Sequence, residues 1–235
     1  MAKDAVAALV ARGGFAPVRR LVINAGMPRS GSSWLYNAMR LLLEASTLPG
    51  EFSHYWIADL TPDTKLTPVT LIKVHSYHPL LAGRAAAIVY SYRDVRDALA
   101  SRARFTGTAQ VVGEASYYVR HDRRWRERAN CVVRYEDLRA DADGVVRAVA
   151  KALGAETVDF AAIKASLAGV SEEYRRSKHI THGGSGTWQA SLSPEVVAAI
   201  ERRHRDWLVE NRYPVSDPPP GPWDRLRRGF WRLVR

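Results

Sequence analysis

A serine-rich turn between a β-branched run and a helical pattern is the part of the sequence best suited to chemistry. The first backbone N–H groups of a helix have no intrahelical partners and lie at the positive end of its dipole. A glycine lets the backbone approach a ligand closely, and hydroxyl groups add hydrogen-bond donors. The turn therefore predicts a binding site for phosphate or sulfate, formed by Arg29, Ser30, Gly31, Ser32 and Ser33.

This turn differs from the P-loop of nucleotide triphosphatases at one decisive position. Gly26 and Gly31 have the P-loop spacing, but Ser32 occupies the position of the P-loop lysine. A nucleotide triphosphatase needs a cation there for the β and γ phosphates. The cation of this turn, Arg29, lies three residues earlier. A P-loop kinase or nucleotide triphosphatase is therefore an alternative that the absent lysine disfavours.

Lys73 and His75 are a second group of candidates, at the end of an apolar run over 69–74 that predicts a strand. Side chains alternate along a strand, so these two point to the same side. Ligands of open parallel sheets bind at the carboxyl ends of the strands. Both side chains are therefore expected to reach a group held by the serine-rich turn, unless they are merely a capping histidine and a surface lysine. His78 is a second, less favoured candidate.

Arg93 and Ser101 form a third group. Arg93 follows the apolar run 85–92, and Asp94 is expected to cap a helix that contains Ser101, eight residues after the arginine. A helix that folds back over the strand can bring the guanidinium and the hydroxyl to one anion. The planar fork of an arginine binds phosphate through two hydrogen bonds, so the pair predicts a second phosphate site.

In this order, the three groups resemble the sulfotransferases that use 3′-phosphoadenosine 5′-phosphosulfate (PAPS). The Arg-Ser-Gly-Ser-Ser turn is similar to the variant found in carbohydrate sulfotransferases. The resemblance implies that residues 29–34 bind the 5′-phosphosulfate, that Arg93 and Ser101 bind the 3′-phosphate, and that the product is adenosine 3′,5′-bisphosphate (PAP). The catalytic residues that it implies are His75 as the base, with Lys73 and Arg29 stabilising the leaving group.

Two further segments extend the resemblance. Tyr135-Glu136-Asp137-Leu138 is similar to a family segment whose tyrosine lies against the adenine, so Tyr135 and Trp34 are expected to flank that ring. The glycine-rich stretch 183–188 ends in Gly-x-Trp, as in family members, and implies a backbone contact from Gly183 to the donor. Thr181 and His182 stand where the animal cytosolic enzymes carry an Arg-Lys pair, so no side chain of this stretch is assigned.

The elements that must position these residues predict an α/β fold. Strand and helix patterns alternate over 1–213, and the resemblance implies a three-layer α/β/α domain with a mostly parallel sheet of the P-loop nucleotide triphosphatase type. Asp143 is expected to cap one of its helices. The segment 46–68 shows no periodicity, so we expect a long loop there. We interpret this loop as the acceptor-binding region, with a packed loop as the alternative. Its candidate residues are Glu51, His54, Tyr55, Trp56 and Asp59.

The composition limits the partners. The net charge of +11 suits a polyanionic ligand, an anionic polymer or an acidic membrane surface. The chain has a single cysteine and neither a secretory signal nor an apolar run of membrane-spanning length, so we expect a cytoplasmic protein. No acidic cluster suggests a metal, so we expect no metal cofactor, and we expect no nucleic acid partner.

Residues 214–235 form a proline-rich linker followed by a basic tail. Arginines surround apolar residues at helical spacing in 223–235, which is typical of an amphipathic helix at an anionic membrane surface. Packing against the domain is an equal alternative. Taken together, the sequence predicts sulfuryl transfer to an acceptor hydroxyl, on a carbohydrate or a glycolipid. The non-catalytic alternative is a basic, membrane-associated binding protein.

Overall fold

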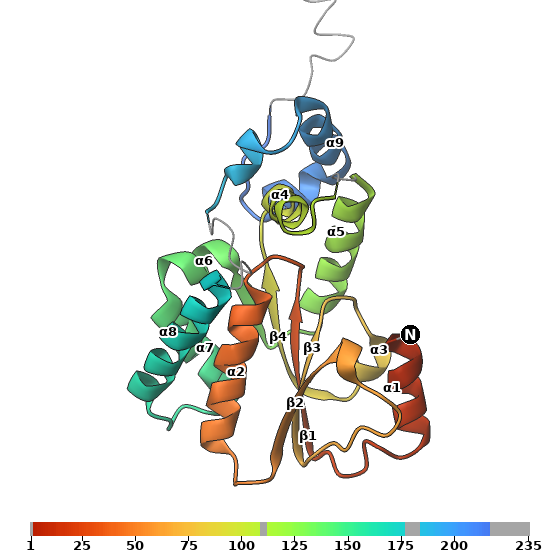
Figure 1. The fold of residues 1–235 in the computed structure, drawn as a ribbon. Coiled ribbons are helices and arrows are strands. Elements are labelled where there is room, and N and C mark those ends of the chain that lie inside the picture. The colour runs from red at the N-terminus through yellow and green to blue at the C-terminus, as the bar shows by residue number, and fades with distance from the viewer. Residues whose placement is uncertain (1, 109–111, 177–183, 217–235) are drawn as a thin grey trace, which may run out of the picture.

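The structure is a computed structural model that describes residues 2–108, 112–176 and 184–216. Within these residues, five strands form one sheet in the order β2-β3-β1-β4-β5, and each neighbouring pair is parallel. Figure 1 shows helices on both faces of this sheet. The strands are β1 Arg20–Gly26, β2 Phe52–Trp56, β3 Val69–Val74, β4 Ala85–Tyr92 and β5 Cys131–Arg134.

The helices surround the sheet in three groups. One group covers one face of the sheet, a second covers the other face, and a third lies beyond the carboxyl ends of the strands (Figure 1). The described α-helices are α1 Ala2–Ala11, α2 Ser32–Ser46, α3 Pro79–Ala82, α4 Val95–Thr106, α5 Val112–Arg126, α6 Tyr135–Ala140, α7 Ala142–Ala152, α8 Phe160–Arg176 and α9 Pro194–Glu210; η1 Ile57–Asp59 and η2 Thr187–Ala190 are short 3₁₀ helices.

Strand β1 is the centre of the sheet and is buried from Leu21 to Gly26. Its Ile23 pairs with Ile72 of β3 and with Ile88 of β4. A parallel strand covered by helices on both faces is a nearly continuous apolar run, which is the pattern of this segment. The serine-rich turn leaves the carboxyl end of this strand and is therefore anchored to the buried, central strand of the sheet.

The two faces of the sheet have separate apolar cores. On one face, α2, α7 and α8 pack their apolar side chains against residues such as Val22 of β1. On the other face, α1, α3 and α5 pack against residues such as Ile23. A third core joins α4, α5 and α9 beyond the carboxyl ends of the strands, with Trp207 of α9 fully buried in it. This third core also contains Met27, which directly follows β1.

The three-layer α/β fold with a parallel sheet, as predicted, is confirmed. The cap at Asp94 is also confirmed, since its side chain accepts a hydrogen bond of 2.9 Å from the backbone N–H of Arg96. The division at residue 213 between domain and tail stays a prediction, and residues 217–235 lie outside the described part.

Two expectations about elements are wrong. The segment 46–68 is not a continuous loop, because β2 forms the edge of the sheet by pairing with β3. Asp143 does not cap α7. Asp141 does, accepting a 2.8 Å hydrogen bond from the backbone N–H of Gly144, because the helix begins two residues earlier than expected. Within the described residues, no helix combines the length and the apolar character needed to span a membrane.

Candidate active site

The serine-rich turn ends at Gly31, which is the N-cap of α2 and has a left-handed φ of 77°. A Cβ atom at this position would lie 3.0 Å from a side-chain carbon of Leu138 and 3.2 Å from the ring of Tyr135. Both the backbone angle and the lack of space therefore require glycine. No side chain caps α2, so the N–H groups of its first turn are left for an anion.

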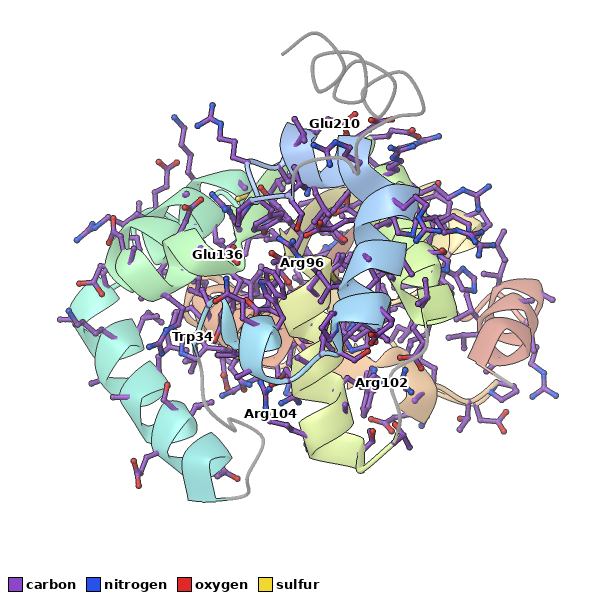
Figure 2. All side chains as sticks on the ribbon, turned by 90° about the horizontal axis from the view of Figure 1, so that it is seen from above. Trp34, Arg96, Arg102, Arg104, Glu136 and Glu210 are labelled. Atoms are coloured by element: carbon purple, nitrogen blue, oxygen red, sulfur yellow. The ribbon has the colours of Figure 1, made fainter. Side chains whose placement is uncertain are left out.

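One cavity of about 1090 Å³ collects most of the residues predicted for the site. Its lining spans the turn, the ends of β3 and β4, and helices α4, α6, α7 and α8. Figure 2, seen from above, shows Trp34 of α2 and Arg104 of α4 on the same side of the molecule. The predicted residues that line the cavity are Arg29, Gly31, Ser32, Ser33, Trp34, Lys73, His75, Arg93, Ser101 and Tyr135.

Two predicted residues stand apart from this set. Ser30 is fully buried, and its hydroxyl hydrogen-bonds to the carbonyl of Met27 at 2.7 Å and the hydroxyl of Ser91 at 2.8 Å. This hydroxyl therefore fixes the turn to β4, and Ser30 is not part of the cavity lining. Gly183 lies outside the described residues.

His75 lies just beyond β3 with its Nδ1 atom 2.7 Å from the carbonyl oxygen of Gly26. A carbonyl only accepts hydrogen bonds, so Nδ1 carries the proton and Nε2 keeps a free lone pair. Burial lowers the pKa of His75 to about 4. The Gly26 hydrogen bond opposes this shift, and the charges of Lys73 and Arg29 add to it. The imidazole is therefore neutral near pH 7 and can accept a proton.

The lysine of the same strand, Lys73, is buried and donates a 2.5 Å hydrogen bond to the hydroxyl of Ser33 in the first turn of α2. Its ammonium nitrogen lies 5.8 Å from the ring centre of Tyr36 and 5.5 Å from that of Trp56. Burial and then the charge of Arg29 lower the pKa of Lys73 to about 8. The strand thus brings a cation to the N-terminus of α2, where a phosphate is expected.

Arg29 connects the two predicted anion sites. Its Nε atom donates a 3.1 Å hydrogen bond to the hydroxyl of Ser101, and its carbonyl accepts one of 3.3 Å from Arg93. Burial and the charge of Arg93 lower the pKa of Arg29, and Arg29 in turn lowers the pKa values of Lys73 and His75. Its charge therefore acts on both ends of the cavity, although its side chain lies at the Ser101 end.

Trp34 and Tyr135 line the same cavity and each contacts a polar partner. The indole N–H of Trp34 donates a 3.1 Å hydrogen bond to the hydroxyl of Ser171 on α8. The guanidinium of Arg93 lies 4.3 Å from the centre of the Tyr135 ring. Such stacking helps to hold the arginine in place, and its Nη atoms also donate hydrogen bonds to the carbonyls of Arg29 and Gly184.

Comparison with known proteins agrees with this geometry. Residues 19–212 match the model of the family described as "Sulfotransferase domain". The chain belongs to the sulfotransferase family. This membership confirms the predicted assignment to the PAPS-dependent sulfotransferases, and it disfavours the kinase and nucleotide triphosphatase alternative. The similarity of the Arg-Ser-Gly-Ser-Ser turn to carbohydrate sulfotransferases is a finer prediction that the family model does not address.

Solved structures share the fold at low sequence identity. Mouse sulfotransferase SULT7A1 complexed with PAP has a TM-score of 0.61 and 14% identity, covering 87% of this chain and 89% of that chain. Retinol dehydratase with androsterone and PAP has a TM-score of 0.55 and 16% identity, covering 88% and 85%. The same enzyme with retinol and PAP has a TM-score of 0.56 and 15% identity, covering 88% of this chain and 86% of that chain. No curated protein matched the sequence.

The sequence did not predict Asp97 as a residue of the site. Its buried carboxylate accepts hydrogen bonds from the backbone N–H groups of Gly186 at 2.7 Å and Trp188 at 3.0 Å, and from the hydroxyl of Thr187 at 2.9 Å. It also lies 3.7 Å from the guanidinium of Arg93. Asp97 therefore links η2 to Arg93, the arginine of the second predicted anion site. The four-residue helical spacing from Arg93 was the available signal.

Proposed function

We propose that this sulfotransferase moves the sulfuryl group of PAPS to a hydroxyl group of an acceptor through the residues described above. The observation that carries the proposal is that the N-terminus of α2, His75, Arg93 and Ser101 line one cavity. A nucleotide with a 5′-phosphosulfate and a 3′-phosphate can therefore contact both anion sites at once. The PAP bound to the structural neighbours supports the same donor.

In this proposal each end of the donor has its own anion site. The N–H groups of residues 31–34 and the hydroxyls of Ser32 and Ser33 bind the 5′-phosphosulfate. Arg93 and Ser101 bind the 3′-phosphate, and Trp34 and Tyr135 flank the adenine. A backbone contact from Gly183 stays part of the proposal, although that residue lies outside the described part.

The proposed chemistry is a direct transfer with His75 as the base. Its Nε2 atom takes the proton of the acceptor hydroxyl while the acceptor oxygen forms a bond to sulfur. The bond between sulfur and the 5′-phosphate oxygen breaks, and its electron pair stays on the phosphate. Lys73, Arg29 and the N–H groups at the start of α2 stabilise the charge that develops there. The products are the sulfated acceptor and PAP.

We propose a carbohydrate or a glycolipid as the acceptor. Trp56, at the end of β2, is 46% exposed and lines the cavity together with Tyr36, on the side where Lys73 lies. Aromatic side chains of this kind offer an apolar face to a ring-shaped ligand, and their polar atoms can bind hydroxyl groups. The neighbours' retinol and androsterone are small apolar alcohols, which form the competing class. Transfer from ³⁵S-labelled PAPS to matched panels of glycans, glycolipids and small alcohols tests the choice.

The proposed location is the cytoplasm, with the basic tail 223–235 in peripheral contact with an anionic membrane. The support is the sequence pattern of the tail, since these residues lie outside the described part. Such a contact would bring the active site close to a lipid-linked acceptor.

Replacement of His75 tests the proposed chemistry. The His75→Ala variant is expected to lose at least roughly 10²-fold in the transfer rate, as is common when a general base is removed. PAP binding should persist, because both anion sites are intact. Turnover with labelled PAPS and calorimetric titration with PAP measure the two effects.

His78→Ala is the matched control, because His78 is buried at the start of α3 and is not part of the cavity lining. It is expected to keep its turnover number. Near-normal turnover in His75→Ala would move the base elsewhere. Glu51 would then be the next carboxylate to test as the base, although it pairs with Arg19 at 2.9 Å. A wild-type chain that binds PAP but transfers nothing to any acceptor would favour the non-catalytic alternative.

A further inference from the structure

Arg104 lines the cavity one helical turn after Ser101. Its Nη1 atom donates a 2.7 Å hydrogen bond to the hydroxyl of Ser191, and Nη2 donates one of 3.3 Å to the hydroxyl of Thr187. Its Nε atom is buried without a hydrogen-bond partner. In the described part of the chain, this guanidinium is thus bound only by neutral hydroxyls.

The surroundings of Arg104 are strongly positive. The hydroxyl of Thr187, which accepts a hydrogen bond from Arg104, donates one to Asp97, and Asp97 lies 3.7 Å from Arg93. The charges of Arg104 and Arg93 both lower the pKa of Arg29. The nearby carboxylate, Asp97, is ion-paired with Arg93 and is already bound to three groups around η2. Arg104 therefore adds a charge that this carboxylate does not balance. Arg104 is partly buried, and a cation that is partly withdrawn from water beside other cations is stabilised by an anion that pairs with it.

We propose that Arg104 is a third ligand of the 3′-phosphate of the donor, beside Arg93 and Ser101. A phosphate monoester carries a charge close to −2 at neutral pH and offers three acceptor oxygens, which matches a cluster of guanidinium groups. This inference rests on the proposed function, because it assumes that PAP binds in this cavity. It makes Arg104 a residue that selects nucleotides bearing a 3′-phosphate over those without one.

Three variants separate this role from a structural one. Arg104→Ala removes the charge. Ser191→Ala removes the strongest hydrogen bond of Arg104 and keeps the charge. Arg102→Ala removes another positive charge of the same cavity lining, but from a side chain whose charge is already paired with Glu114. Figure 2 shows Arg102 and Arg104 on opposite sides of α4, with Arg104 on the side of Trp34.

Calorimetric titration with PAP and with adenosine 5′-phosphate measures the selection for the 3′-phosphate. In Arg104→Ala the Kd for PAP is expected to rise about tenfold or more, the usual effect of losing a charge-assisted hydrogen bond. The Kd for adenosine 5′-phosphate should stay within about twofold, since that nucleotide lacks the group in question. Arg104→Lys should recover part of the affinity. Ser191→Ala and Arg102→Ala should each change the PAP Kd by less than about threefold, by the same scale.

Each other outcome is informative. An unchanged PAP Kd in Arg104→Ala overturns the inference. So does equal weakening of both nucleotides, or an effect of Ser191→Ala as large as that of Arg104→Ala, because either result indicates a structural role. If the wild-type chain binds no PAP at all, the proposed function itself fails, and the inference fails with it.

Discussion

Burial favours the neutral forms of Lys73 in β3 and of His75 just beyond it, with different consequences for the proposed chemistry. For His75, a pKa of about 4 keeps the imidazole neutral at physiological pH, as a base requires. For Lys73, a pKa of about 8 leaves the ammonium charged near pH 7 but close to losing its proton. The end of β3 thus combines a neutral imidazole with a cation, because burial lowers the pKa of both side chains.

These two pKa values predict a pH profile for kcat/KM, which reports the free enzyme. In the proposed mechanism, activity requires neutral His75 and charged Lys73. It should therefore rise as the pH rises through about 4 and fall as the pH rises through about 8. In Lys73→Arg, the alkaline fall should move above pH 10, because an arginine keeps its charge. Steady-state kinetics from pH 4 to pH 10 measure both limbs.

The exposed Lys65 provides the control for this profile. Lys65→Arg makes the same substitution away from the cavity and should leave the alkaline limb near pH 8. A wild-type profile that stays flat up to pH 10 would contradict the role given to Lys73.

At the residue scale, the sequence predicts motifs made of neighbouring residues, but it does not predict hydrogen bonds between residues that are far apart in the chain. The turn and the pair Lys73 and His75 follow from strand and helix patterns of a few residues. The hydrogen bond from Arg29 to Ser101 joins residues 72 positions apart, and the bond from Ser30 to Ser91 spans 61. Such contacts depend on how the strands are ordered in the sheet, which no local pattern specifies.

Strand β2 illustrates the same limit at the scale of elements. Its residues are partly buried or exposed and include a serine and a histidine, so the segment lacks the apolar run of a core strand. It is a strand because the edge of β3 offers hydrogen-bonding partners from Val69 to Lys73. This pairing places Trp56 directly opposite Lys73. A segment predicted as a loop therefore delivers an aromatic side chain to the cavity through a regular element.

Helix α5 holds the residues after β3 in place. The indole N–H of Trp125, which is fully buried, donates a 3.2 Å hydrogen bond to the carbonyl of His75. One turn earlier, Nδ1 of His121 accepts a 2.8 Å hydrogen bond from the backbone N–H of Tyr77. The orientation of the imidazole therefore depends on a helix that is distant in sequence.

Trp125→Phe tests this dependence. Loss of the indole donor leaves a buried carbonyl unsatisfied, so the free energy of unfolding should fall by about 1–3 kcal/mol. The kcat should fall as well, because the backbone of His75 is less firmly held, while the PAP Kd should not change. Urea denaturation, turnover and titration with PAP measure the three quantities.

Trp207→Phe is the matched control, since its indole N–H also makes a buried hydrogen bond, of 2.7 Å to Asp122. This variant should lose comparable stability and keep its kcat. If Trp125→Phe and Trp207→Phe lower kcat equally, the effect comes from general destabilisation, and α5 has no special role in positioning His75.

At the scale of the whole molecule, the parallel sheet explains why the site is a single cavity. All five described strands run in the same direction, so their carboxyl ends meet on one side of the sheet. The turn after β1, His75 after β3 and Arg93 after β4 are thereby brought together from three parts of the chain. This convergence follows from the fold class. The sequence could therefore predict that the two proposed anion sites lie close together, but it could not predict the contacts between them.

The excess of positive charge is also a property of the whole chain, and the tail carries part of it. Residues 217–235 contain five arginines and two aspartates around apolar side chains. Basic residues near an anionic membrane contribute about 1 kcal/mol each. The full chain is therefore expected to float with vesicles that contain phosphatidylserine and to stay behind with vesicles of phosphatidylcholine alone. A chain that ends at residue 216 should float with neither.

A salt titration and a second variant separate the electrostatic from the apolar contribution to membrane binding. Electrostatic attraction is screened within about 10 Å at 0.1 M salt, so flotation should decrease as salt is raised. Replacing Trp223, Phe230 and Trp231 by serine keeps every charge and removes apolar area, so it should weaken flotation as well. If the full chain and the chain ending at 216 float equally, the tail does not bind the membrane. Packing against the domain then becomes the better account of its apolar residues, and the acceptor need not be lipid-linked.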